Sequence, residues 1–142
     1  MTMAKIQNRE LLTEIFGSWP SFHDAEILSI QLDRGGEDGP SLTAVIHLWR
    51  MTNKVDANGY IVCKNYTLAT LRFGHILLEM LNGFNHQNVL SELSISTIDS
   101  NISENDHCSF GILMETSYGC QAMFKCRSIT VLKAEPHSVY PA

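Results

Sequence analysis

The stretch Phe16-Gly17-Ser18-Trp19-Pro20-Ser21-Phe22-His23-Asp24-Ala25-Glu26 joins a single predicted helix to a long run of predicted strands. It holds three large aromatic side chains, a proline and three ionisable groups. Gly17 stands where a left-handed glycine ends a helix, and Pro20 prevents the helix from resuming. The stretch therefore predicts a boundary between helical and extended chain.

The residues before this boundary predict a helix over about 8–16. Asn8 is a suitable N-cap, and Glu10 places negative charge in the first turn. One apolar stripe runs along the segment and consists of Leu11, Leu12, Ile15 and Phe16. A helix this short is stable only when such a stripe packs on another element.

The residues after the boundary alternate between apolar and polar, which is typical of strands. The predicted strands cover residues 25–33, 42–51, 60–73, 76–81, 89–98, 107–116 and 120–133. Residues 60–73 form one long strand or two strands broken near 64–65. In residues 75–82 periodicity does not separate a strand from a short helix, and the bracketing by Gly74 and Gly83 favours a strand.

Helix and strands together predict an α+β fold, with one N-terminal helix followed by a mostly antiparallel sheet of about six or seven strands. A length of 142 residues fits a single domain, 1–142. Its parts are the helix at about 8–16, the sheet at about 25–133 and a loose tail at about 134–142. We expect the helix to cover one face of the sheet, and the sheet either to expose its other face or to curl on itself.

Composition narrows the class of protein. Hydrophobic residues make up 44% and charged residues 18%, as in ordinary globular proteins. The first ten residues lack the apolar core of a signal peptide, and no apolar run is long enough to cross a membrane. We therefore expect a cytoplasmic protein. The net charge of −5 and the ten scattered Lys and Arg residues argue against nucleic acid as a partner.

The four cysteines favour buried free thiols. Cys63, Cys108, Cys120 and Cys126 are scattered, form no C-x-x-C pair and each fall in a strand-like run. A zinc site requires tighter paired spacing. We therefore expect neither a metal nor another cofactor.

The cluster of His23, Asp24 and Glu26 is the one local group of catalytic residue types. A metal site or an active site would recruit it together with a distant histidine. Neighbouring residues on an extended chain point to opposite faces, so His23 and Asp24 converge only if the backbone turns. We favour a structural role, in which Asp24 secures the start of the first strand through a turn or through backbone N–H groups.

The aromatic side chains of the same stretch also have two interpretations. We expect Trp19 and Phe22 to fix the connection on the core, since such side chains dominate core energetics. The alternative is an exposed anchor for a partner. The expected structural motif consists of Gly17, Trp19, Pro20, Phe22, His23 and Asp24.

No nucleophile motif or phosphate-binding glycine loop supports an enzyme. If a cationic partner exists, the acidic loops are its first candidate contact surface. The candidate partner-binding residues are Glu37, Asp38, Asp99, Glu104 and Asp106.

Two segments resemble the immunity protein 50 family. The first runs from Phe16 to Ile27, and the second is Phe73 followed by Gly83-Phe84-Asn85-His86-Gln87-Asn88-Val89. The resemblance implies an antitoxin of a bacterial polymorphic toxin system, which binds a cognate toxin domain in the cytoplasm without catalysis of its own. It carries over no toxin-contact residues.

The leading hypothesis is therefore a non-catalytic, toxin-neutralising immunity protein, whose toxin could be basic because the chain is acidic. One alternative is a small metal-dependent or hydrolytic enzyme that uses His23, Asp24 and Glu26. Another is a self-associating β-domain that pairs through an exposed strand.

Overall fold

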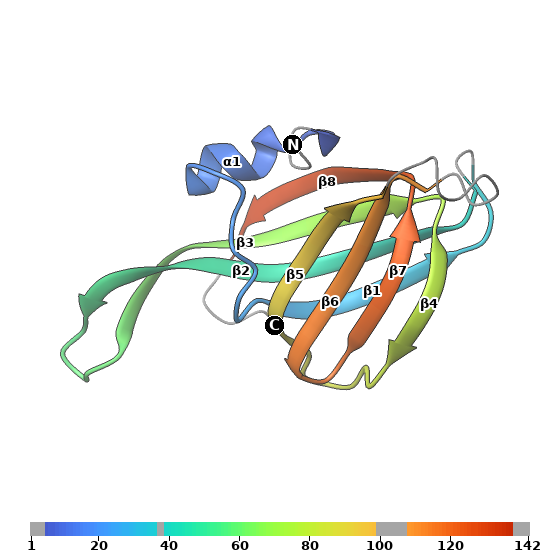
Figure 1. Cartoon of the computed structure of the whole chain (residues 1–142). Coiled ribbons are helices and arrows are strands. Elements are labelled where there is room, and N and C mark those ends of the chain that lie inside the picture. Colours follow the sequence, from blue (N-terminus) through green and yellow to red (C-terminus); the bar gives the residue numbers. More distant parts are fainter. Residues whose placement is uncertain (1–4, 37–38, 99–107, 138–142) are drawn as a thin grey trace.

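The computed structural model describes residues 5–36, 39–98 and 108–137, and within them it has one helix and eight strands (Figure 1). The elements are α1 (Glu10–Phe16), β1 (Glu26–Asp33), β2 (Ser41–Val55), β3 (Ile61–Gly74), β4 (Leu77–Asn82), β5 (Val89–Thr97), β6 (Phe110–Tyr118), β7 (Gln121–Cys126) and β8 (Ser128–Pro136). The paired strands are antiparallel and form one sheet in the order β4-β7-β6-β5-β1-β2-β3-β8. The α+β class is roughly right, although the fold is mostly β.

The additional strand comes from residues 120–133, which do not form the single strand expected. The chain leaves β7 after Cys126 and starts β8 at Ser128, at the opposite edge of the sheet. Between them the backbone N–H of Arg127 donates to the carbonyl of Gly74 at 2.9 Å. The sequence did not reveal this change of neighbouring strand, because buried and less buried side chains alternate in β7 and at the start of β8 alike. β8 also continues to Pro136, into the segment expected to be a loose tail.

The two uncertain segments are both strands. Residues 61–74 form one strand, in which Asn65 adopts a φ of 59° where the register with β2 shifts. Residues 77–82 form β4, as the bracketing glycines indicated, at one edge of the sheet.

The helix ends as predicted and begins differently. Gly17 has a φ of 83°, and its N–H donates to the carbonyl of Thr13 at 2.7 Å. The N-cap is Arg9, which makes no side-chain capping bond, so the prediction of Asn8 was wrong. Asn8 is instead held at a φ of 59°, because Gln7 pairs with β8 directly before it.

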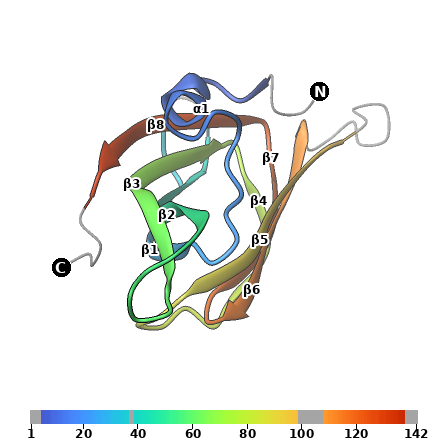
Figure 2. The same ribbon diagram turned by 90° about the vertical axis from the view of Figure 1, so that its left-hand side faces the viewer.

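The sheet curls into two facing halves. In Figure 2, β1, β2 and β3 lie on the left, β4 to β7 on the right, and α1 above them. β1 and β5 pair at one position, Glu26 with Val89, and run apart from there. The rings of Phe73 on β3 and Phe124 on β7 meet edge to face with centroids 5.1 Å apart. The core therefore lies between the halves, and Leu12 of α1 joins it.

Asn88 fixes the junction of the halves. Its side chain is buried, with 2% of the residue exposed. Its amide nitrogen donates to the carbonyls of Ile27 (3.3 Å) and Asn85 (2.8 Å). Its oxygen accepts from the backbone N–H groups of Asn85 and Cys120, both at 3.0 Å. One side chain thus connects β1, the loop before β5 and the turn before β7.

Gly119 leaves room for the buried side chain of Asn88 because it has no Cβ. Its φ is 89°, and a Cβ there would lie 2.7 Å from the side-chain oxygen of Asn88 and in closer conflict with the carbonyl of Gln87. The turn at Tyr118-Gly119 joins β6 to β7, which pair as a hairpin.

Candidate protein-binding surface

His23 and Asp24 converge because the backbone turns where they lie. The N–H of Ala25 donates to the carbonyl of Phe22 at 3.0 Å, and Asp24 has a φ of 68°. This brings Nδ1 of His23 to 3.3 Å from Oδ2 of Asp24, and both side chains remain about half exposed, at 59% and 46%. Glu26 lies outside the turn, as the first residue of β1.

This geometry ties the turn to the sheet through the backbone. The N–H of Asp24 donates to the carbonyl of Leu90 in β5 at 2.8 Å. Its carboxylate accepts no backbone N–H among the described residues and contacts His23 instead. A search of the same residues finds no group of three or more His, Cys, Asp or Glu placed to hold a metal ion.

The aromatic residues of the connecting stretch face the core. Phe22 is buried, and Trp19 packs against the core cluster with part of its surface exposed. Their ring centroids lie 5.8 Å apart. Both side chains thus hold the connection between α1 and β1 against the sheet.

Four aromatic rings, from β2, β3 and the residue directly after β8, form a cluster that the sequence did not indicate. The ring of buried His47 lies 5.2 Å from Trp49, 5.8 Å from Tyr66 and 5.4 Å from His137. Ile46 and Leu48 point into the core, so His47 between them points outward. The cluster supports β2 and β3 at the place where they leave the body of the sheet.

Beyond this cluster β2 and β3 continue as a projecting hairpin, residues 50–64, which we call the arm (Figure 1). Arg50 pairs with Lys64, Met51 with Cys63, and Val55 with Ile61. The carboxylate of Asp56 closes the turn by accepting the N–H groups of Asn58 at 2.9 Å and Tyr60 at 3.0 Å. The arm therefore has an ordered turn and a defined register.

Large apolar side chains are exposed along the arm. They are Met51 (48% exposed), Val55 (62%), Tyr60 (70%), Ile61 (56%) and Val62 (36%). Among the other large apolar residues that are exposed in the described part of the chain, Leu77, Leu78 and Met123 lie on the paired strands β4 and β7, and the rest are divided among other elements. An apolar surface concentrated in this way is typical of an interaction site.

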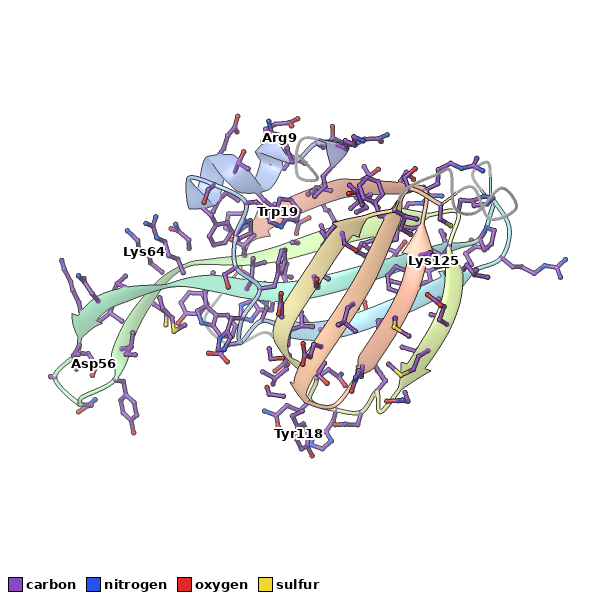
Figure 3. The ribbon with its side chains drawn as sticks, viewed as in Figure 1. Arg9, Trp19, Asp56, Lys64, Tyr118 and Lys125 are labelled. Atoms are coloured by element: carbon purple, nitrogen blue, oxygen red, sulfur yellow. The ribbon has the colours of Figure 1, made fainter. Side chains whose placement is uncertain are left out.

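The arm is also positively charged. Arg50, Lys54 and Lys64 are its cations and Asp56 its one carboxylate, which gives a formal charge of +2 on a chain of −5. None of the three cations forms an ion pair with another described residue. Figure 3 shows Lys64 on the side of the arm that faces α1.

Two shallow hollows adjoin at the base of the arm. One, of about 350 Å³, lies between the stretch after α1 and the end of β2; its lining includes Trp19, His23 and Trp49. The other, of about 480 Å³, lies on the arm itself. Arg50 and Met51 line both, so the hollows form one concave surface.

A third hollow, of about 220 Å³, lies away from the arm and is lined by Ile30, Leu32, Leu81 and Phe84. It is apolar and carries no cation. The adjacent β4 is an edge strand with Leu77 and Leu78 exposed. The third hollow is smaller than either hollow at the arm, and no charged side chain lines it.

The five acidic residues proposed from the sequence, Glu37, Asp38, Asp99, Glu104 and Asp106, lie outside the described residues. The sequence did not indicate the arm as a candidate, because the expected strands ended at residue 51 and began again at residue 60, so that no strand was expected over 52–59. The signal was present in Val55, Ile61 and Val62, which lie beside the turn at Asn58-Gly59. No helix in the described part of the chain is long and apolar enough to span a membrane.

Comparison with known proteins adds one match. No curated protein and no solved structure matches the chain. The family model described as Immunity protein 50 matches residues 8–137. This range takes in α1, all eight strands and both segments that carried the resemblance. The chain therefore belongs to the Immunity protein 50 family.

Proposed function

We propose that this protein is an immunity protein that binds a cognate toxin domain of a bacterial polymorphic toxin system in the cytoplasm and blocks it without catalysis of its own. Family membership is the observation that carries this proposal. The exposed apolar side chains of the arm agree with it, since a protein that acts by binding needs an interaction surface. The net charge of −5 would also attract a basic toxin.

Co-expression with the toxin domain encoded beside this gene tests the proposal. We expect growth to be restored when both proteins are produced in the cytoplasm, and an inactivated toxin domain to form a stoichiometric complex in size-exclusion chromatography. An unrelated toxin serves as the control. Continued growth arrest together with separate elution of the two proteins would refute the proposal.

The enzyme alternative draws on the contact between His23 and Asp24, since His23 also lines the hollow at the base of the arm. Replacing the carboxylate alone, as Asp24→Asn, separates the two functions, because Asp24 does not line the concave surface at the base of the arm. A binding protein should still protect cells and form the complex. Loss of protection with an intact complex would identify a catalytic contribution instead.

A further inference from the structure

We infer that the arm, with the concave surface at its base, is the docking surface for the toxin, and that the face it binds combines apolar side chains with carboxylates. This inference rests on the proposed function. It places the contact on residues 50–64 and not on the acidic loops that the sequence suggested.

The first argument is the apolar surface. Val55 and Ile61 form a cross-strand pair, and each of the two residues is more than half exposed. Tyr60 beside them is 70% exposed. Tyrosine is enriched among the residues that supply most of the binding energy at interfaces, and the burial of apolar area on Val55 and Ile61 would add to it. The arm places them beyond the body of the sheet, where a partner can reach both faces of the hairpin.

The second argument is the charge. Arg50 and Lys64 lie directly opposite each other in the ladder, and like charges in this position destabilise a sheet. Lys54 adds a third cation to the same surface, while the residues outside the arm together carry −7. Carboxylates on the partner would relieve this repulsion, whereas no described residue of the chain forms an ion pair with these cations.

Two other occupants fit less well. Nucleic acid would pair with the cations but leave Val55, Ile61 and Val62 uncovered, and the negative charge of the remaining chain would repel it. A second copy that docked arm against arm would bring two sets of cations together. A partly apolar face with carboxylates, on a toxin that is basic elsewhere, matches the cations and the apolar area of the arm as well as the negative charge of the rest of the chain.

Charge reversal in the full-length protein tests the inference. We choose Lys54→Glu and Lys64→Glu in the arm, and Arg9→Glu before α1 as the matched control with the same change in net charge. The probe is the inactivated toxin domain, titrated by calorimetry. We expect each arm variant to bind at least tenfold more weakly than wild type, and Arg9→Glu to bind within about threefold of it.

Substitutions at two exposed apolar residues, one in the arm and one outside it, complete the test. Ile61→Asn should weaken binding at least tenfold, and Leu77→Asn on the exposed edge strand β4 should not. A melting temperature close to that of wild type shows that each variant is folded.

The results separate the two proposals. If wild type fails to bind the toxin domain, the proposed function is refuted. If wild type binds and all three arm variants bind equally well, the toxin is held elsewhere and only this inference is refuted. Binding of wild type to a DNA or RNA duplex that is lost in Lys64→Glu, with toxin binding unchanged, would also overturn it. A stable dimer that Ile61→Asn dissociates, again with unchanged toxin binding, would assign the arm to a second copy.

Discussion

Asn88 shows how one residue holds the junction of the two halves of the sheet together. Its amide group makes four hydrogen bonds that join β1, the loop before β5 and the turn before β7. Because Asn88 and Cys120 are both buried, the backbone N–H of Cys120 depends on this side chain for its acceptor. The segment around Asn88 thus serves the architecture of the fold, and the candidate binding surface consists of other residues.

Removal of this amide should be strongly destabilising. Asn88→Ala leaves the backbone N–H of Cys120 without its acceptor, and we expect a loss of about 2–4 kcal/mol in the free energy of unfolding. Asn58→Ala, at the exposed tip of the arm, should change it by less than about 0.5 kcal/mol. Urea unfolding measures both. Equal effects would show that the buried bonds do not stabilise the junction.

Asp24 makes a second prediction at this scale, because its φ of 68° is unfavourable for branched side chains. Asp24→Val should destabilise the protein by about 1–2 kcal/mol more than Asp24→Gly, which removes the same carboxylate. The difference in thermal stability between the two variants isolates the backbone strain. If valine and glycine are equivalent, the contact with His23 matters more than the turn.

Cys126 gives the stability a dependence on pH. Burial, together with nearby Cys108, raises the pKa of the Cys126 thiol to about 12 from 9.0. Above pH 9 the unfolded state releases this proton while the folded state keeps it, so stability falls as pH rises. The slope contributed by Cys126 should approach about 1.4 kcal/mol per pH unit between pH 9 and 12.

Urea unfolding of wild type and Cys126→Ala at pH 8, 9, 10 and 11 tests this dependence. The variant should lose less stability with rising pH, because lysines and tyrosines titrate alike in both proteins. Parallel curves would show that the Cys126 thiol ionises equally well in the folded state.

At the scale of the elements, local sequence chemistry predicted where a helix ends better than it predicted which strands pair with one another. Gly17 was identified as the end of α1 because a left-handed glycine is a local requirement. Asn8 failed as the N-cap because Gln7 pairs with β8, more than a hundred residues away in the sequence. The break at Arg127 was missed for the same reason, since both flanking strands bury alternate residues and only the sheet order separates them.

A substitution in the arm should weaken toxin binding and at the same time stabilise the fold. Lys64→Glu converts the repulsion with Arg50 into a cross-strand attraction. We expect the free energy of unfolding to rise by about 0.2–1 kcal/mol at low salt, and the gain to shrink at high salt. Thermal unfolding at two salt concentrations measures this. A less stable variant would mean that Lys64 contributes to the fold, and its loss of toxin binding would then need another explanation.

Over the whole molecule, the candidate surface arises from tertiary arrangement. The hollow at the base of the arm joins Trp19 and His23 from the connecting stretch to Trp49 and Met51 of β2. Alternation along each strand predicts which side chains are buried, but it does not reveal how far a hairpin extends beyond its sheet. The sequence therefore predicted the α+β class and most strands, while the arm became visible only with the sheet assembled.

The curled sheet makes a final prediction about the whole fold. Phe73 and Phe124 come from opposite halves and meet edge to face with centroids 5.1 Å apart. Phe73→Leu and Phe124→Leu should each destabilise the protein. The double variant should lose less than the sum, with a coupling energy of about 0.5–1.5 kcal/mol. Phe73→Leu combined with Phe84→Leu, outside the core, should be additive within about 0.5 kcal/mol. Additivity of the core pair as well would mean that the halves do not pack through these rings.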